Sequence, residues 1–365
     1  MNNIKKVCIL TWHYYTNFGS GLQAFALQYI IESLGYKVSI VNYHNPKFGQ
    51  VSVFKNLVRI CIGNTLGKIP IKSVERFRYA STCFSHKYHH VGKLTTDEMQ
   101  LNELTKDCDV FVCGSDQIWA PNVFNPVYFA AFANKGIRKV SYAASIGLNA
   151  IPKDLVSKYK EMLESFYVVG IREEEGKNLL KRECDINSTV VLDPTFMVDV
   201  NVYLKMQRKV IGIKKPYLFC YFLNKEHKYR EKVQEYARVH KLQIVGVSDK
   251  LSDDEWMNRL TGLGADHFLW LINNAETIMT DSYHGSIFSL LFHKNLWIFQ
   301  RFAEDNPNCQ NSRIRQLQND FNIGHRIISV ASLIDESIPI DYNNFESQLK
   351  KLRASSMDFL KQALR

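Results

Sequence analysis

The sequence predicts an α/β protein built from two Rossmann-like βα domains that face a central cleft. The chain has 365 residues, and domains of about 150 residues each make two the expected number. Short apolar runs alternate with stretches of helical periodicity in both halves. Polar residues follow the apolar runs at their C-terminal ends, where open parallel sheets bind ligands. These three observations predict both the fold class and the place of a binding site.

The N-terminal half begins with a strand, a helix and a second strand. Residues 7–11 are apolar, 22–34 carry apolar side chains at helical spacing, and 37–43 are again rich in β-branched residues. This order is the usual start of a parallel sheet. Further strands are expected at 109–113, 139–144, 167–171 and 189–192, with helices at 153–165 and 174–182.

The C-terminal half repeats the alternation. Strands are expected at 217–222, 243–247, 277–279 and 296–299, and helices at 225–240, 266–274 and 287–293. The amphipathic stretch 345–364 indicates a closing helix. We therefore assign residues 1–197 to an N-terminal domain, 198–342 to a C-terminal domain and 343–365 to a helix that packs back.

A basic helical insertion of about residues 44–95 interrupts the first domain. From Lys37 to Lys93 the chain has seven Lys and three Arg against Glu75 alone. Apolar residues interleave with the basic ones, as in helices that lie on anionic membranes. Two interpretations stay open, peripheral contact with anionic lipid or a phosphorylated carrier, and a solvated basic face. No nucleic acid partner is expected, because the sequence has no helix-turn-helix, zinc-finger or RNP motif.

Other features limit the compartment and the cofactors. No apolar stretch reaches the roughly 18 residues that a membrane span needs, and the apolar run at 7–10 is too short for a signal peptide. The eight cysteines form no CxxC pair, and no His, Cys, Asp or Glu cluster has metal-ligand spacing. We expect a cytoplasmic protein with no metal or cofactor, and contact with the inner face of the plasma membrane depends on the basic insertion.

Two motifs in the N-terminal half suit the binding of sugar hydroxyls. Asn17-Phe18-Gly19-Ser20-Gly21-Leu22-Gln23 opens a helix, where exposed amides bind anions or sugar oxygens, although a plain tight turn is the alternative. Gly114-Ser115-Asp116-Gln117-Ile118-Trp119 follows a strand and offers a carboxylate, an amide and an indole. Such groups bind hydroxyls and stack on pyranose rings. For Asp116 alone, a helix N-cap is the alternative.

A third motif, Asp281-Ser282-Tyr283-His284-Gly285-Ser286, joins a strand to an apolar helix in the second half. Histidine is the side chain best suited to acid/base work near neutral pH, and a helix start suits a phosphate. Arginines that could hold an anion are Arg172 at a strand end, Arg301 after a strand, and Arg313 on an expected helix. Arg172 has ion pairing with a neighbouring glutamate as its alternative.

Together these pieces resemble the polysaccharide pyruvyl transferase family. The motifs around residues 9–24, 114–119, 141–147, 172–173, 192–195 and 281–285 occur in the family's order. The resemblance implies a fold like that of B-type glycosyltransferases, with the acceptor on the N-terminal domain and the donor on the C-terminal domain. It also implies transfer of a pyruvyl group from phosphoenolpyruvate to a sugar as a ketal, with release of phosphate. Acceptors in the family include lipid-linked oligosaccharides of capsule and exopolysaccharide assembly.

The resemblance also implies roles for individual residues. His284 and Asp116 are the expected catalytic pair. The expected phosphoenolpyruvate contacts are Arg172, Ser282, Tyr283, Gly285, Ser286 and Arg313. The expected acceptor contacts are Asn17, Gly19, Ser20, Gln23, Ser115, Gln117 and Trp119. Ser282 stands where many relatives have an arginine, so Arg313 or Arg301 is expected to replace that cation from another element.

Two other functions stay open at this point. One is a glycosyltransferase of the same fold that uses a nucleotide sugar. The other is a non-catalytic sugar- or lipid-carrier-binding protein on that scaffold, which the departure at Ser282 keeps in view.

Overall fold

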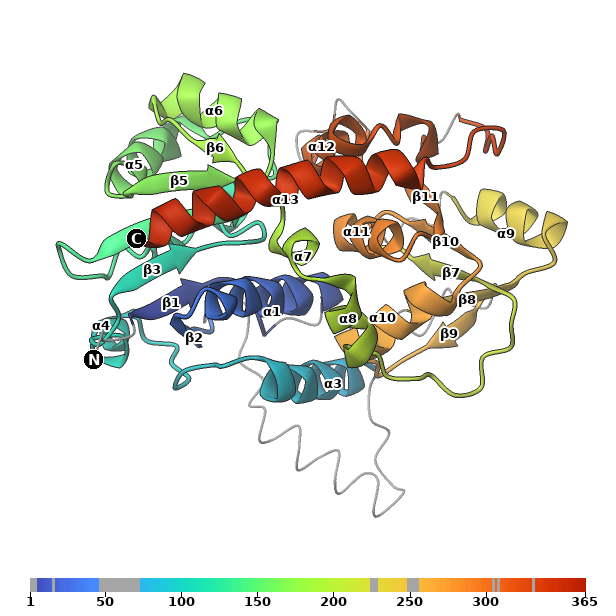
Figure 1. Cartoon of the computed structure of the whole chain (residues 1–365), viewed down its shortest axis with the longest axis horizontal. Helices are drawn as coiled ribbons and strands as arrows, with labels where there is room; N and C mark the ends of the chain where they lie inside the picture. The colour runs from blue at the N-terminus through green and yellow to red at the C-terminus, as the bar shows by residue number, and fades with distance from the viewer. Residues whose placement is uncertain are drawn as a thin grey trace, which may run out of the picture.

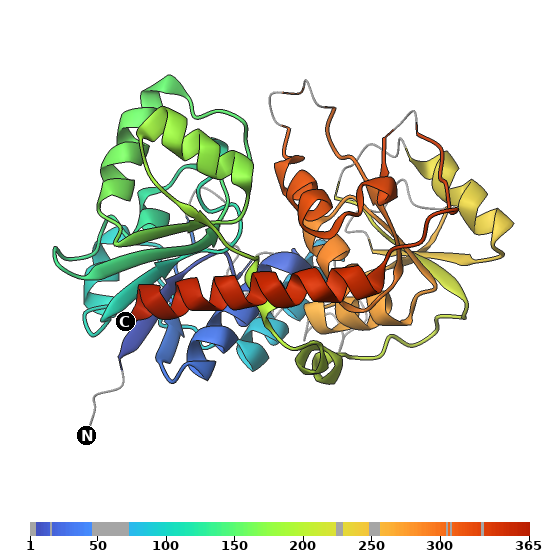
Figure 2. The same ribbon diagram turned by 45° about the horizontal axis from the view of Figure 1, so that its top comes forward.

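Each half of the chain folds around one parallel β-sheet. The structure is a computed structural model that describes residues 5–14, 17–45, 73–223, 229–247, 256–303, 306, 309–329 and 332–365. Within these residues the strands form two six-stranded sheets, ordered β2-β1-β3-β4-β5-β6 and β12-β11-β10-β7-β8-β9. Every neighbouring pair is parallel. Figures 1 and 2 show the two sheets side by side, each with helices packed around it.

The strands are short and mostly buried. In the N-terminal sheet they are β1 (Lys6–Leu10), β2 (Lys37–Ile40), β3 (Val110–Cys113), β4 (Arg138–Ala144), β5 (Val168–Ile171) and β6 (Thr189–Val190). In the C-terminal sheet they are β7 (Tyr217–Tyr221), β8 (Gln243–Val247), β9 (Asn258–Leu260), β10 (Thr277–Thr280), β11 (Asn295–Phe299) and β12 (Ile327–Ile328). The short strands β9 and β12 were not predicted, because three and two residues give no readable alternation.

The helices connect and cover these strands. They are α1 (Phe18–Ser33), α3 (Ser73–Tyr88), α4 (Leu101–Leu104), α5 (Lys153–Glu164), α6 (Glu174–Cys184), α7 (Pro194–Met197), α8 (Val200–Met206), α9 (Arg230–Val239), α10 (Ala265–Asn274), α11 (Tyr283–Leu291), α12 (Ser312–Phe321) and α13 (Tyr342–Leu364). Helix α11 begins at Tyr283, earlier than the predicted start at residue 287, because Ser282 caps it through its side chain. No helix among the described residues is long and apolar enough to cross a membrane.

Strand order reverses once in each sheet. In the N-terminal sheet the chain runs outward from β1 to β2 and then continues on the other side from β3, so the reversal lies between β1 and β3. In the C-terminal sheet it lies between β7 and β10. Loops that leave such a point diverge and open a crevice at the C-terminal ends of the strands. The fold therefore offers two facing crevices.

One hydrophobic core joins the two halves. Helix α1 contacts α10 and α11 across the molecule. At its start, the Phe18 ring stacks on Phe268 of α10 at 4.9 Å between centroids and lies 5.5 Å from the ring of Tyr221. Because these rings are buried together, the beginning of α1 is fixed against the C-terminal half. This contact sets the distance between the facing crevices.

The C-terminal helix α13 runs across both halves (Figures 1 and 2). Near its end Phe359 packs close to Gly170 of β5, and near its start His293 pairs with Glu346 at 2.8 Å. In the middle, Arg353 donates a hydrogen bond to the carbonyl oxygen of Phe196. The helix thus connects both sheets and the segment between them, as a closing helix was expected to do. The domain boundaries at 197 and 342 remain an assignment from the sequence.

The basic insertion is described only in part. Residues 46–72, which include the predicted interleaving of basic and apolar residues, lie outside the described residues. In the described part, α3 packs on α1 and α10 with Phe77 and Phe84 buried. Arg76 and Arg78 of this helix are exposed. For α3, therefore, the apolar side chains face the core and the basic ones face solvent.

Candidate active site

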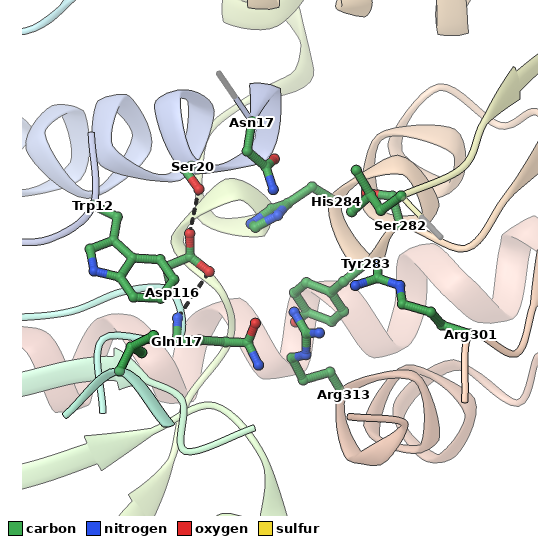
Figure 3. Close-up of a pocket in the computed structure, with 12 residues that line it drawn as sticks. Trp12, Asn17, Ser20, Asp116, Gln117, Ser282, Tyr283, His284, Arg301 and Arg313 are labelled. Carbon is green, nitrogen blue, oxygen red and sulfur yellow. Dashed lines mark hydrogen bonds between the residues drawn. The ribbon is translucent and has the colours of Figure 1, made fainter. Parts of the chain in front are cut away.

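A cavity of about 380 Å³ lies where the two crevices face each other. Its walls come from the loops after β1, β3, β7, β10 and β11 and from α12, as the strand reversals predict. The lining residues are Trp12, Asn17, Ser20, Asp116, Gln117, Val123, Leu223, Ser282, Tyr283, His284, Arg301 and Arg313. Figure 3 shows the N-terminal residues on one side, the arginines on the other and His284 between them.

His284 lies in the first turn of α11. The Ser282 side chain accepts a hydrogen bond from the Gly285 amide at 3.2 Å, which fixes the start of the helix directly after β10. This turn directs the largely buried imidazole toward the N-terminal half. There its Nε2 lies 3.6 Å from Oδ2 of Asp193. A titratable ring and a carboxylate from opposite halves thus meet at the cavity.

Asp193 is a fully buried carboxylate at the start of α7. Its Oδ1 accepts hydrogen bonds from the amide and hydroxyl of Thr195, and its Oδ2 accepts one from Nη1 of Arg172 at 2.8 Å. Burial alone would raise the pKa of Asp193, but His284, Arg172 and Thr195 outweigh it and hold this pKa well below its usual value. The group behind His284 is therefore an ionised carboxylate.

Gly19 provides the space that the His284 ring occupies. A Cβ atom built at position 19 would overlap Nδ1, Cγ and Cβ of His284. Only a residue without a side chain lets α1 approach the imidazole this closely. Gly19, predicted as an acceptor contact, is instead in contact with the candidate catalytic histidine.

Asp116 lies at the turn after β3 and points into the cavity (Figure 3). Its backbone has a positive φ of 73°, which turns the chain sharply after the strand. Its Oδ2 accepts a hydrogen bond from Ser20 Oγ at 2.6 Å, and its Oδ1 accepts one from the Gln117 amide at 2.9 Å. The two predicted acceptor motifs are therefore linked through Ser20 and Asp116.

Three guanidinium groups lie near one another, and two of them approach the ring of Tyr283. Cζ of Arg172 lies 4.6 Å from the Tyr283 ring centroid and that of Arg313 lies 5.7 Å from it. Arg301 is held by Asp281, whose carbonyl oxygen accepts from Nη2 at 2.9 Å. Burial, together with repulsion from Arg172 and Arg301, lowers the pKa of Arg313 to about 10. Such a concentration of buried positive charge is suited to an anion.

The donor residues predicted from the sequence divide into two groups. Ser282, Tyr283 and Arg313 line the cavity, as does Arg301, the other expected replacement for the missing arginine. Arg172 does not line it and is bound to Asp193 instead. Gly285 and Ser286 do not line the cavity either. Their amides donate to the hydroxyl and the carbonyl oxygen of Ser282 at the start of the helix.

The acceptor residues divide in the same way. Asn17, Ser20 and Gln117 line the cavity, but Gln23, Ser115 and Trp119 do not. Gln23 is buried and donates to the carbonyl oxygens of Trp12 and Ser20. Ser115 Oγ bonds to the Ala143 carbonyl and to Asp193.

The prediction that Trp119 stacks on a sugar is corrected by the structure. The Trp119 side chain is fully buried. Its ring stacks on Phe129 with centroids 5.1 Å apart, and its Nε1 donates to the carbonyl oxygen of Tyr128 at 3.0 Å. After the sharp turn at Asp116, Gln117 still lines the cavity, but Ile118 and Trp119 enter the core.

Sequence reasoning gave no role to Asp193 or Trp12. Asp193 precedes Pro194 at the end of a strand, which is an ordinary helix N-cap signal. Trp12 lies shortly after Leu10, the last residue of β1. The motifs of Asp116 and His284 also lie just past the C-terminal end of a strand, so this position is the signal that could have identified Trp12. Among the described residues, no group of three or more His, Cys, Asp and Glu side chains is placed to hold a metal ion.

Fold and cavity together define a two-sheet α/β protein with a cavity between its halves. The UDP-GlcNAc 2-epimerase from Methanocaldococcus jannaschii is similar over 95% of this chain and 92% of its own, with 12% identity and a TM-score of 0.51. That from Neisseria meningitidis, bound to UDP-GlcNAc, is similar over 99% of both chains, with 9% identity and a TM-score of 0.51. The glycosyltransferase SnogD from Streptomyces nogalater covers 98% of this chain and 95% of its own, with 9% identity and a TM-score of 0.45. The predicted fold class is confirmed.

The chain belongs to the polysaccharide pyruvyl transferase family, whose model matches residues 17–300. This range contains both acceptor motifs, Asp193 and the His284 motif, and it ends before Arg313. Membership confirms the predicted resemblance and implies transfer of a pyruvyl group to a polysaccharide. Comparison with curated proteins gave no match to this sequence.

Proposed function

We propose that this protein transfers the pyruvyl group of phosphoenolpyruvate to two hydroxyls of a sugar in a surface-polysaccharide precursor. The product is a cyclic ketal, and inorganic phosphate is released. One observation carries the proposal beyond family membership. His284, backed by the ionised carboxylate of Asp193, opens on the same cavity as Arg301 and Arg313. An acid/base group and an anion site therefore lie within reach of one ligand.

The arginine side of the cavity is suited to the donor. Phosphoenolpyruvate carries a carboxylate and a phosphate, and guanidinium groups bind both in a bidentate manner. Arg301 and Arg313 line the cavity, and among the described residues Nε of Arg313 has no hydrogen-bond partner. In this account the two arginines bind the donor directly and replace the cation missing at Ser282. Arg172 supports the site by holding Asp193.

His284 supplies the proton that starts the reaction. Addition of a proton to the methylene carbon of phosphoenolpyruvate converts it to a methyl group and leaves a cation at C2. One sugar hydroxyl attacks C2 and loses its proton. A second hydroxyl then displaces phosphate from C2, and its proton leaves with the phosphate. Overall, the proton lost by the first hydroxyl replaces the one that was added to the methylene carbon, and the proton lost by the second hydroxyl is carried away by the released phosphate.

Asp116 is the proposed base on the acceptor side. Its carboxylate lines the cavity and is fixed by Ser20 and by the Gln117 amide. A carboxylate held in this way accepts a hydrogen bond from a sugar hydroxyl and draws its proton away as the oxygen attacks. Asn17 and the Gln117 side chain offer further hydrogen bonds to neighbouring hydroxyls.

Turnover with labelled donor tests the proposal. Purified protein is incubated with phosphoenolpyruvate labelled with ¹³C at C2 and a panel of hexopyranosides. We expect phosphate release that depends on the sugar, a new ketal carbon signal, and loss of both by a factor of about 10² or more in His284→Ala. A ketal formed equally well by His284→Ala would exclude this histidine. Transfer from a nucleotide sugar with no use of phosphoenolpyruvate would replace the proposal with glycosyl transfer.

A further inference from the structure

The two walls of the cavity differ in chemistry. The C-terminal wall contains Arg301 and Arg313, which suit an anion. The N-terminal wall contains an indole, two amides, a hydroxyl and a carboxylate, from Trp12, Asn17, Gln117, Ser20 and Asp116. An aromatic ring beside a few polar groups is the composition with which proteins bind pyranose rings. Figure 3 shows Trp12 on the same side as Ser20 and Asp116.

Trp12 is held in place by the scaffold around it. Its carbonyl oxygen accepts a hydrogen bond from Nε2 of Gln23 at 2.9 Å, and the same amide nitrogen lies 3.0 Å from the carbonyl oxygen of Ser20. The indole is half-buried and meets the ring of Tyr128 edge to face, with centroids 6.4 Å apart. One side chain, Gln23, therefore ties together the backbone at Trp12 and the backbone at Ser20, whose hydroxyl bonds to Asp116.

We infer that Trp12 is the platform on which the pyranose ring of the acceptor stacks. The inference rests on the proposed function and adds the residue that recognises the sugar. The C–H groups on one face of a pyranose pack against an aromatic ring, while the hydroxyls at its edge reach Asp116 and Gln117. The sequence has five tryptophans. Among the described residues that line this cavity, Trp12 is the one tryptophan. Trp12 thus takes the role that was predicted for Trp119.

This role makes the site selective for a ring rather than for a set of hydroxyls. An open-chain hexitol has more hydroxyls than a methyl hexopyranoside but has no rigid C–H face. It should therefore bind the polar groups poorly without the stacking contact. Asp116 can bind the hydroxyls of a pyranoside and of a hexitol alike. A preference for the pyranoside is therefore the effect that we expect from Trp12.

Intrinsic fluorescence provides a direct test, because stacking changes the emission of the indole concerned. Methyl galactopyranoside, methyl glucopyranoside and sorbitol are titrated into the unsubstituted protein, Trp12→Phe and Trp270→Phe. Trp270 is the matched control, since it is also half-buried but lies on α10 and does not line the cavity. At least one pyranoside should change the emission of the unsubstituted protein and of Trp270→Phe. Trp12→Phe and every sorbitol titration should show no change.

Kinetics with the same variants separate sugar recognition from a structural effect. Trp12→Ala should raise KM for the pyranoside about tenfold or more, with KM for phosphoenolpyruvate changed less than about twofold. A rise in both constants, a pyranoside signal that survives in Trp12→Phe, or no signal from any pyranoside would overturn the inference. Failure of phosphoenolpyruvate to stabilise the protein, with the Trp12-dependent signal intact, would instead overturn the proposed donor and leave the sugar platform standing.

Discussion

Nε2 of His284 lies 3.6 Å from Oδ2 of Asp193, and the two residues come from opposite halves of the molecule. Removal of either partner should therefore stop turnover without loss of the fold. We expect Asp193→Asn to lower kcat by about 10² or more, because it removes the negative charge that lies beside the His284 ring. The kcat of the variant is measured from phosphate release at fixed times, and circular dichroism checks that the variant is folded. A kcat within twofold of the unsubstituted protein would exclude the pair as a functional unit.

The same carboxylate makes stability depend on pH. The pKa of Asp193 is lower in the folded protein than in the unfolded chain. Its contribution to stability is therefore present above the unfolded value of about 3.9 and is lost as pH falls toward the folded value. The stability difference between the unsubstituted protein and Asp193→Asn should therefore be larger at pH 7 than at about pH 2.5 in urea denaturation. A difference that grows toward acid pH would contradict the lowered pKa.

Gly19 and His284 lead to a further prediction. Gly19→Ala places a Cβ in the space of the His284 ring, so the imidazole must move and kcat should fall by about tenfold or more. Gly21→Ala is the matched control on the same helix, because its Cβ would lie 3.5 Å from Phe84, an ordinary packing distance. Equal activity of the two variants would show that the position of the ring is not critical.

Arg313 should contribute to binding at the expense of stability. Burial and the neighbouring arginines lower its pKa to about 10, so folding keeps its charge in an unfavourable place. Arg313→Gln should leave the melting temperature unchanged or raise it, and weaken phosphoenolpyruvate binding about tenfold or more. Arg238→Gln, at an exposed position on α9, should change neither. A clear loss of stability in Arg313→Gln, with binding retained, would assign Arg313 a structural role.

Trp119 should matter for stability alone. Its ring is buried against Phe129, so Trp119→Ala should cost about 3–5 kcal/mol of unfolding free energy. The milder variant Trp119→Phe should lower the melting temperature and leave KM for the sugar unchanged. A raised sugar KM in Trp119→Phe would restore the original prediction for this residue.

The sequence was sufficient for the fold and for the choice of a candidate site. Alternation of strands and helices predicted two parallel sheets, and polar residues after β3 and β10 predicted where Asp116 and His284 would lie. The rest depended on contacts that no local pattern contains. Asp193 has the signal of a helix cap, and its contact with His284 exists only because the two halves of the chain meet. Gln23 and Trp119 were assigned from their motifs, but the direction of a side chain after a tight turn depends on the core it can enter.

Calorimetric titration with phosphoenolpyruvate tests the central claim most directly. The unsubstituted protein and Arg313→Gln are titrated with phosphoenolpyruvate, inorganic phosphate and UDP-GlcNAc. The account predicts that phosphoenolpyruvate binds to the unsubstituted protein more tightly than phosphate does, and that Arg313→Gln loses most of this affinity. Binding of UDP-GlcNAc with no binding of phosphoenolpyruvate would contradict the account and assign the cavity to a nucleotide sugar.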